Sequence, residues 1–316
     1  MLSYLFRRTL SLFITLVIAS VVIFISLEII PGDPASYMLG INAQPDTIEA
    51  LREELGLNRS KLERYLVWVK NMILGDFGIS YTYRSPVNEM VLERLKVSLP
   101  LALLALFIST IIAIPVGIYA AANYGKTSDF SIMGLTQFGI ALPNFWFAIL
   151  LVYLFAITLR WFSAGGFAGW DEGFLLGLKS LLLPAISLAL PQASILSRVM
   201  RSSLLETLNE DFIKTARAKG LTENQSLLRH GVRNALIPVF TILGLQFSFL
   251  IAGAIIIENV FFLPGLGRLI FQSIAQRDLI VVESVIMLLV FAVVIVNFLI
   301  DIAYLVIDPR LRVKTL

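Results

Sequence analysis

Six long runs without a charged side chain constrain this sequence more than any other feature. They cover residues 9–27, 97–125, 130–159, 180–197, 234–257 and 284–300. A helix needs about 20 mostly apolar residues to cross a bilayer, and each run reaches that length with its interfacial flanks. We therefore predict spans at approximately 9–30, 98–122, 131–158, 180–198, 236–257 and 282–305.

The composition agrees with a membrane protein. Hydrophobic residues make up 58% of the 316 residues and charged residues only 15%, which is too apolar for a soluble globular domain. The first run follows Arg7 and Arg8, as in a signal peptide, but it exceeds a typical signal core and no small-residue cleavage site follows. The sequence predicts an all-α polytopic membrane protein with a retained first span and a single domain over residues 1–316.

Basic residues are distributed unevenly between the two sides. The loop 31–97 is left out of the comparison, because long segments cross the membrane regardless of charge. One side then carries thirteen basic residues: Arg7, Arg8, Lys126, Arg198, Arg201, Lys214, Arg217, Lys219, Arg229, Arg233, Arg310, Arg312 and Lys314. The other side carries four: Arg160, Lys179, Arg268 and Arg277. Since basic loops stay inside, we expect both termini and the loop 199–235 in the cytosol, and the long loop 31–97 outside.

Apolar residues at helical spacing predict two amphipathic helices in the outer loop, one ending at Gly56 and one at Gly75. The first stripe comprises Ile48, Leu51 and Leu55, and the second comprises Leu62, Tyr65, Leu66, Val69 and Ile73. A helix with one apolar stripe normally buries it. Packing against the spans is therefore favoured over direct ligand contact, which remains the alternative.

The spans contain a few features of their own. Small residues that allow close helix packing recur every four positions at Ser109, Ala113, Gly117 and Ala121. Pro143 lacks an amide donor, which predicts a kink in the third span. Glu28, Glu258 and Asp301 fall at span ends, where they can reach the interface. Amides inside spans favour helix contacts or an aqueous path, and Asn144 and Gln246 are the candidates for lining a pathway.

A polar stretch from Glu206 to Pro238 separates two predicted spans and reads as two helices. Asn209 should cap the first helix, and Gly220 should end it. Acidic Glu210 and Asp211 would lie in its first turn, and basic Lys214, Arg217 and Lys219 in its last, as the helix dipole favours. A capping box of Thr222 and Gln225 predicts the second helix. This helix would carry Leu227, Leu228 and Val232 on one side.

The motif Thr215-Ala216-Arg217-Ala218-Lys219-Gly220, followed by Arg229-His230, Arg233-Asn234-Ala235 and Pro238, resembles the cytoplasmic loop of ABC importer permeases. In that family this loop docks on the ATPase. The general pattern begins with Glu-Ala-Ala, whereas this chain has Thr215-Ala216-Arg217. In the general pattern a Leu-Pro pair also follows the glycine at a shorter distance than Pro238 follows Gly220. Both departures resemble the dipeptide and oligopeptide branch. Small Ala216 and Ala218 would let the ATPase approach closely.

Other segments carry the same resemblance. Pro31-Gly32-Asp33-Pro34 and Gly75-Asp76-Phe77-Gly78-Ile79-Ser80, with Pro86-Val87, look like the start and end of the outer loop in peptide-type permeases. The run Glu258-Asn259-Val260-Phe261-Phe262-Leu263-Pro264-Gly265-Leu266-Gly267 resembles the outer element after the fifth span. There Glu258, Pro264 and Gly265 would shape an outer gate, and Gly265 would permit backbone angles that a side chain opposes.

The resemblance implies the first of two paralogous permease subunits of a bacterial dipeptide or oligopeptide ABC importer, a multi-pass protein of the plasma (inner) membrane. The implied partners are a second permease subunit that completes a heterodimer, two cytosolic ATPase subunits or domains, an extracytoplasmic solute-binding protein and the lipid bilayer. This chain would supply half of the pathway. Related permeases also serve nickel, glutathione and opine-like solutes, so these substrates remain alternatives.

No catalytic, metal or cofactor site is expected in this chain. It has no cysteine, and His230 is its only histidine, without a nearby set of ligands or a catalytic partner. Gly125-Lys126-Thr127 resembles the end of a phosphate loop, but Ala120 stands where the first glycine should be. ATP and magnesium are therefore expected on the partner ATPases. The dispersed basic residues do not suggest nucleic-acid binding.

Two other functional classes remain as alternatives to an importer permease. An ion-coupled secondary carrier would need an intramembrane acidic residue for the coupling ion, and the span-end positions of the acidic residues argue against it. An intramembrane hydrolase would need a nucleophile and a base in mid-bilayer, and no such pair is apparent in the sequence.

Overall fold

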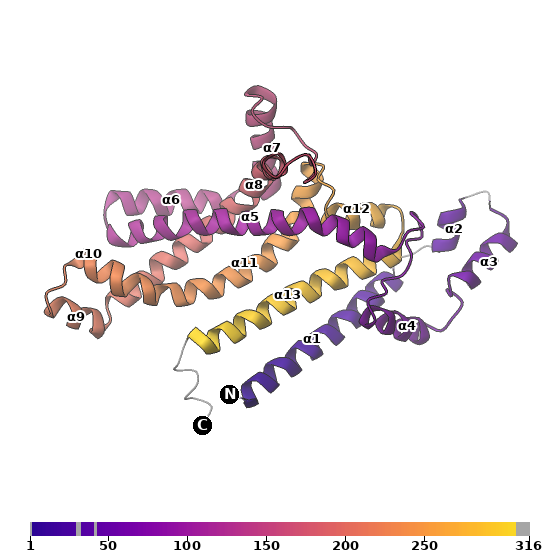
Figure 1. The fold of residues 1–316 in the computed structure, drawn as a ribbon, viewed down its shortest axis with the longest axis horizontal. Coiled ribbons are helices and arrows are strands. Elements are labelled where there is room, and N and C mark those ends of the chain that lie inside the picture. Colours follow the sequence, from indigo (N-terminus) through magenta and orange to yellow (C-terminus); the bar gives the residue numbers. More distant parts are fainter. Residues whose placement is uncertain (1, 30–32, 41–42, 308–316) are drawn as a thin grey trace. The chain divides into compact units, whose positions relative to one another are not determined.

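The structure is a computed structural model that describes residues 2–29, 33–40 and 43–307. Pro31, Gly32, Arg310, Arg312 and Lys314, which entered the expectations above, lie outside these ranges. The regular elements within them are helices (Figure 1). In chain order they are α1 (Leu2–Glu28), α2 (Pro34–Leu39), α3 (Pro45–Glu54), α4 (Lys61–Ile73), α5 (Val87–Ala122), α6 (Thr127–Ala141), α7 (Asn144–Leu151), the π-helix η1 (Val152–Thr158), α8 (Phe174–Leu208), α9 (Asp211–Ala218), α10 (Glu223–Ser226), the π-helix η2 (Leu227–Gly231), α11 (Val232–Val260), α12 (Leu266–Ala275) and α13 (Leu279–Ile307).

Five helical segments are long and apolar enough to cross a membrane. They are Phe6–Glu28, Val87–Ala122, Phe174–Leu208, Glu223–Val260 and Leu279–Ile302. The pair Thr127–Ala141 and Asn144–Thr158 becomes a sixth candidate if the two helices form one span. For the described residues, an all-helical chain with five to six candidate spans is confirmed.

Several helices extend well beyond the uncharged runs. α5 begins at Val87 rather than near residue 98, and in its charged first part Lys96 Nζ donates a hydrogen bond of 2.6 Å to Glu93 Oε1. α8 continues to Leu208, and helical turns resume at Glu223, so most of the predicted loop 199–235 is helical. The boundaries differ because charges mark the end of an apolar environment, whereas the helix ends only where its backbone hydrogen bonds stop.

The third predicted span is broken rather than kinked. Its two helices, α6 and α7, meet at an angle of 98°. Pro143 between them has an extended backbone, with φ of −64° and ψ of 132°, and it serves as the N-cap of α7. Because proline donates no amide hydrogen, α6 cannot continue through it, and the chain restarts as a new helix.

The chain divides into two compact units. The first comprises Met1–Val97 and Pro264–Phe298, and the second comprises Ser98–Leu263 together with the described residues that follow Phe298. In the first unit α4 packs against α1. Ser60 begins α4 with a capping box, in which its Oγ accepts from Glu63 N at 3.3 Å and its backbone N donates to the Glu63 side chain at 3.2 Å.

Only part of the predicted apolar stripe of α4 faces α1. The ring of Tyr65 lies 5.4 Å from that of Phe24 on α1, and its hydroxyl lies 2.9 Å from Ser20 Oγ. Glu28 at the end of α1 pairs with Arg64 at 3.2 Å. Three members of the stripe are largely exposed, so their predicted burial is wrong: Leu62, Leu66 and Ile73. The rotation of α4 about its axis is therefore set by the contacts of Tyr65 with α1 and by the Arg64–Glu28 ion pair, rather than by the aliphatic stripe.

The buried carboxylate of Asp278 organises another part of the first unit. It lies immediately before α13 and accepts hydrogen bonds from Ser80 Oγ at 2.5 Å and from the backbone N–H of Tyr81 and Thr82, both at 3.1 Å. Gly78 has a φ of +81°, and a Cβ added there would lie 3.0 Å from Ile280 Cδ1. The segment after α4 is therefore held against the start of α13.

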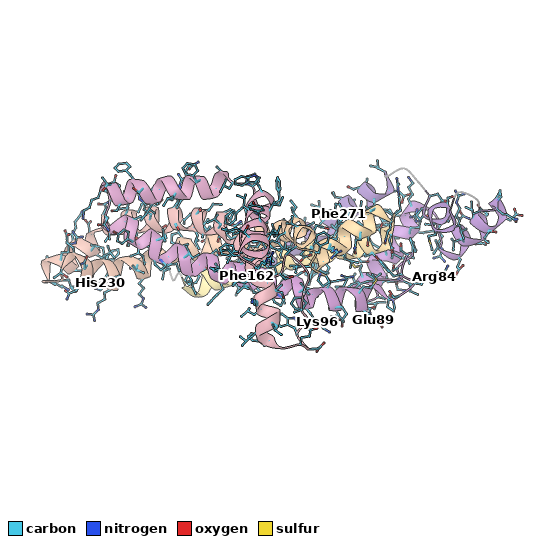
Figure 2. The ribbon with its side chains drawn as sticks, turned by 90° about the horizontal axis from the view of Figure 1, so that it is seen from above. Arg84, Glu89, Lys96, Phe162, His230 and Phe271 are labelled. Carbon is cyan, nitrogen blue, oxygen red and sulfur yellow. The ribbon has the colours of Figure 1, made fainter. Side chains whose placement is uncertain are left out.

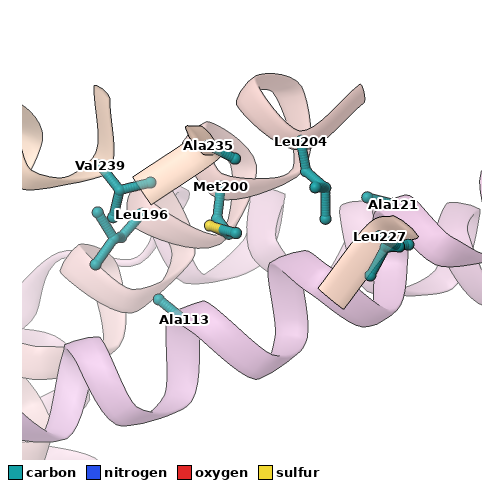
Figure 3. Close-up of a cluster of buried hydrophobic side chains, with 8 residues drawn as sticks. All are labelled: Ala113, Ala121, Leu196, Met200, Leu204, Leu227, Ala235 and Val239. Carbon is teal, nitrogen blue, oxygen red and sulfur yellow. The ribbon is translucent and has the colours of Figure 1, made fainter. Parts of the chain in front are cut away.

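In the second unit α8 packs against α6, α7 and α11. A cluster of buried apolar side chains joins α8 to α5, η2 and α11 (Figure 3): Ala113, Ala121, Leu196, Met200, Leu204, Leu227, Ala235 and Val239. A Cβ added at Gly117 of α5 would lie 2.6 Å from Met200 Cβ and 2.7 Å from Ser197 O. The small-residue stripe of α5 is thus a close-packing surface, as predicted.

Alanine substitutions at two glycines test this packing. The methyl group of Gly117→Ala would overlap α8, so we expect a destabilisation of about 1–3 kcal/mol. The matched control is Gly134→Ala on α6, where an added Cβ has no neighbour within 4 Å and where alanine favours the helix. Thermal unfolding in detergent measures both variants. Equal melting temperatures would contradict the close approach of α5 and α8.

Candidate functional site

The helix predicted after Asn209 is present as α9, but its cap differs. Glu210 is the N-cap of α9, without a side-chain capping bond. Asn209 belongs to the end of α8, and its Nδ2 donates to Leu205 O at 3.0 Å. The predicted cap is wrong because Asn209 has φ of −85° and ψ of −9°, a helical conformation, whereas an N-cap residue is extended.

Gly220 ends α9 as predicted. Its φ is +96°, and its backbone N donates to Arg217 O at 2.9 Å, while Leu221 N donates to Ala216 O at 3.3 Å. A Cβ added at Gly220 would meet nothing within 4 Å. Glycine is therefore favoured here by the left-handed backbone alone, which is the usual conformation after the end of a helix.

The predicted capping box starts the next helix. Thr222 Oγ1 accepts from Gln225 N at 3.3 Å, and Thr222 N donates to Gln225 Oε1 at 3.1 Å. α10 then passes through the π-helical turn η2 directly into α11. The wider π-helical turn buries Leu227 and leaves Leu228 62% exposed. The prediction that both leucines share one side is wrong for this reason.

α9 turns one side to its own chain and the other to solvent. Ile213 and Ala216 are buried against the rest of the chain, so Ala216 leaves little surface for a partner. The exposed set comprises Asp211, Phe212, Lys214, Thr215, Arg217, Ala218 and the following Lys219. Phe212 is 43% exposed and was missed as a site residue. Its signal in the sequence is one aromatic residue at the start of a polar helix.

Arg217 connects α9 to α10 within the chain. Its Nε donates to Ser226 Oγ at 3.3 Å, and its Nη1 lies 3.5 Å from Glu223 Oε1. On the solvent side, Lys214 Nζ donates to Asp211 Oδ1 at 2.8 Å. This hydrogen bond, with the attraction of the two charges, lowers the pKa of Asp211 and raises the pKa of Lys214 from their ordinary values. Both groups therefore remain charged near neutral pH.

α9 and α10 lie at the end of the second unit where α8 ends and α11 begins (Figure 1), and His230 of η2 lies at the same end (Figure 2). Leu227 belongs to the buried cluster of Figure 3. A Cβ added at Gly231 would lie 3.0 Å from Leu204 Cδ1. Because packed interiors resist deformation, a displacement of this end should be shared by α8 and α11.

A second polar contact, which sequence reasoning missed, joins α6 to α8. The carboxylate of Asp129 accepts two hydrogen bonds from Arg201, from Nε and Nη2, each of 2.7 Å. Asp129 also accepts from Gly125 N at 3.1 Å, and the Arg201 guanidinium lies 5.2 Å from the Tyr124 ring centre. Bidentate pairs of this kind fix geometry. The lone acidic residue between two uncharged runs was the available signal.

The two amides expected to line a pathway have different environments. Gln246 is buried on α11, and its Nε2 donates to Gln192 O on α8 at 2.8 Å. The side-chain oxygens of Gln246 and Gln192 are buried, and no described residue forms a hydrogen bond with them. Asn144 is half-buried at the first position of α7, and its Nδ2 lies 3.5 Å from a Cβ built at Gly253. Both amides thus lie near contacts of α11 with a neighbouring helix.

The expected gate residues are divided between the two units. In the second unit, Glu258 is fully buried and accepts a hydrogen bond of 2.5 Å from Ser98 Oγ. In the first unit, Pro264 precedes Gly265, the N-cap of α12. Gly265 has φ of −105° and ψ of −178°, which any residue can adopt, so the expected need for glycine is wrong. The left-handed residue of this run is Phe262, with φ of 54°.

Comparison with known families covers most of the chain. The family described as "Binding-protein-dependent transport system inner membrane component" matches residues 113–313. The family described as "Binding-prot-dependent transport system membrane comp, N-term" matches residues 1–102. The stretch with α9 and the contacts of α8 and α11 lies in the first match.

Individual relatives match along nearly the full length. A permease protein of Brucella abortus (strain 2308), named after a peptide transport system, is 42% identical over 297 residues, which is 94% of this chain and 95% of that protein. The glutathione transport system permease protein GsiC of Escherichia coli (strain K12) is 36% identical over 314 residues, which is 99% of this chain and 100% of that protein. A solved structure of the MetNI methionine ABC transporter, in an inward-facing conformation, shares the fold with a TM-score of 0.58 at 16% identity, over 69% of this chain and 96% of that chain.

Proposed function

The chain belongs to the family of binding-protein-dependent transport system inner membrane components, and from this premise we propose that it forms half of a peptide pathway that α9 couples to ATPases. As a member it is a multi-pass inner membrane permease subunit of an ABC importer, without catalytic function, because the ATPase of such a transporter is separate. An ion-coupled carrier and an intramembrane hydrolase are no longer candidates.

Family membership implies an ATPase and a binding protein as partners. We infer a more specific assembly: a heterodimer with a second, paralogous permease subunit, two ATPase subunits or domains, and an extracytoplasmic solute-binding protein. The separate N-terminal match over residues 1–102 supports the first of two permease types, which the outer-loop motifs also favour.

Peptides are the proposed substrates. The Brucella abortus relative is named after peptide transport, and the Escherichia coli relative is named after transport of glutathione, itself a small peptide. The outer-loop motifs and the departures of Thr215-Ala216-Arg217 from the general loop pattern favour the same branch. Nickel and opine-like solutes remain the alternatives within the family.

The single observation that supports coupling is the two-sided character of α9. Ile213 and Ala216 anchor the helix to its own chain, whereas Phe212 and Ala218 are exposed beside charged residues. Arg217 fixes α9 to α10, which continues into α11. A short helix held in this way can transmit a rigid-body shift from an ATPase to α8 and α11. We therefore assign docking to Phe212, Thr215, Ala218 and Lys219, with Ala216, Arg217 and Gly220 as supports.

Phe212→Ala tests the docking face without disturbing buried contacts. Loss of an exposed aromatic anchor should weaken ATPase association roughly tenfold, which corresponds to about 1.4 kcal/mol. Gly220→Val should act on the support, because its left-handed backbone resists a β-branched residue by about 1–2 kcal/mol. Copurification with the ATPases and uptake by the reconstituted complex are the measurements. Leu228→Ala, an exposed apolar residue outside α9, is the matched control. Full association of Phe212→Ala, or an equal loss in Leu228→Ala, would remove α9 as the docking helix.

The orientation is also a proposal, based on the thirteen-to-four distribution of basic residues. The chain lacks cysteine, so single cysteines can replace the exposed residues Ser60, Thr127 and Asn224. Ser226 is buried and cannot report its side of the membrane. An impermeant thiol reagent should label only position 60 in intact cells, and all three positions after permeabilisation. Labelling of position 224 in intact cells would reverse the orientation.

We further propose Asn144, Gln246 and Gln192 as pathway residues, and Glu258 with Pro264 and Gly265 as parts of an outer gate. Buried amide oxygens without partners support the pathway, and a buried carboxylate bound to Ser98 supports the gate. Gln246→Leu and Glu258→Gln should reduce uptake severalfold with unchanged ATPase copurification. Normal uptake by either variant at normal expression would withdraw that residue from its role.

A further inference from the structure

A cavity of about 290 Å³ lies entirely within the first unit. Its walls come from the end of α1, the turn between α3 and α4, one side of α4, the segment after α4 and the first turns of α13. This volume is at the lower end of ligand-binding pockets. It suits a small molecule or the terminal group of a larger one.

The cavity contains polar groups that the chain itself does not satisfy. Glu283, the fifth residue of α13, is half-buried and lines the cavity, and its carboxylate has no hydrogen bond or ion pair with any described residue. Trp68 also lines the cavity, although its Nε1 is enclosed in the wall, where it has no acceptor among the described residues. Buried donors and acceptors are normally paired, and an unpaired one calls for a water or a ligand. The cavity therefore offers a carboxyl group without a hydrogen-bond partner among the described residues.

The charges of the walls favour a cation near Glu283. Three acidic residues line the cavity, Glu54, Asp76 and Glu283, against two basic residues, Arg59 and Arg64. Arg64 Nη1 donates to Glu28 at 3.2 Å, and the Arg64 charge also attracts Glu283 from beyond ion-pair distance. A free anion would thus meet a surplus of negative charge, whereas a cation would find an unpaired carboxylate.

Aromatic rings supply the remaining walls. Phe24, Trp68, Phe77 and Tyr81 line the cavity together with Glu283. Burial raises the pKa of Tyr81 to about 12, and the Glu283 carboxylate adds to this effect, so its phenol remains neutral at physiological pH. A carboxylate among neutral aromatic rings is the arrangement that recognises ammonium groups, by charge and by cation–π attraction.

We propose that this cavity binds a primary ammonium group at Glu283, among the aromatic rings of Phe24, Trp68, Phe77 and Tyr81. Two sources carry this chemistry. One is the amino terminus of a short peptide, and the other is the phosphoethanolamine headgroup of a lipid. Binding at this site needs neither the ATPases nor transport, so it stands or falls independently of the coupling role of α9.

The test is a titration of the full-length chain in detergent free of ethanolamine lipids. The probes are Ala-Ala, N-acetyl-Ala-Ala, which keeps the peptide but lacks the ammonium, and O-phosphoethanolamine. Heats of binding and quenching of Trp68 fluorescence, with Trp68→Phe as the reference for the signal, give the affinities. We expect Ala-Ala or O-phosphoethanolamine to bind and N-acetyl-Ala-Ala not to bind. Glu283→Gln should weaken binding about 10- to 100-fold, the usual effect of losing a hydrogen bond to a charged group.

Control variants separate recognition from folding. Glu53→Gln makes the same change at an exposed residue of α3 that does not line the cavity, and it should bind like the wild type. Glu283→Gln removes an unpaired half-buried charge, so its melting temperature without ligand should not fall. Trp68→Phe should weaken binding severalfold, and its affinity is measured from the heats of binding because it lacks the Trp68 fluorescence signal. It provides a second variant if Glu283→Gln does not fold.

Each outcome decides the proposal. Binding of Ala-Ala alone identifies a peptide terminus, and binding of O-phosphoethanolamine, with retention of phosphatidylethanolamine by the purified chain, identifies a lipid headgroup. Both results support the ammonium site. The proposal would be overturned if neither Ala-Ala nor O-phosphoethanolamine binds, or if N-acetyl-Ala-Ala binds as well as Ala-Ala. Unchanged affinity in Glu283→Gln would also overturn it.

Discussion

The need to satisfy every backbone amide and carbonyl inside the bilayer governs this chain. Hydrocarbon offers no hydrogen-bond partners, so the spanning segments must be helices that pair their own backbone. The consequence is visible at Pro143, where one missing donor ends α6 and starts α7 at 98°. Polar turns, caps and ion pairs are then confined to helix ends. This is why α9, its glycine turn and the capping box of α10 gather where α8 stops and α11 begins.

Helix association in lipid has little hydrophobic driving force, so close packing has to replace it. In the second unit this replacement is the approach of α5 to α8 at Gly117, together with the cluster around Met200. Asp129 and Arg201 add a fixed point between α6 and α8. α9 is attached to a body in which α8 is held by several neighbours. That arrangement suits a part that must move as one piece.

The sequence was sufficient for features determined by local chemistry. The uncharged runs located the candidate spans, and Gly220 and the Thr222–Gln225 capping box are where the pattern placed them. It failed where tertiary contacts decide. Asn209 stays helical because α8 runs on, Leu228 is exposed because of a π-helical turn, and α4 is rotated by its aromatic residues. Asp129, Glu283 and Phe212 matter through neighbours distant in sequence or through exposure, and a lone acidic or aromatic residue in the sequence does not by itself identify such a role.

The buried polar groups of this chain are of two kinds, those with partners and those without, and this difference bears on function. At the cytosolic end proposed for the second unit, Arg217, Asp129 and Arg201 have partners within the chain. Satisfied groups hold geometry, which is what a mechanical contact requires. In the first unit, Glu283 lines a cavity and Trp68 Nε1 is buried, and neither has a hydrogen-bond partner among the described residues. Unsatisfied buried groups lower stability unless something else binds them, so their persistence there argues for recognition rather than for support.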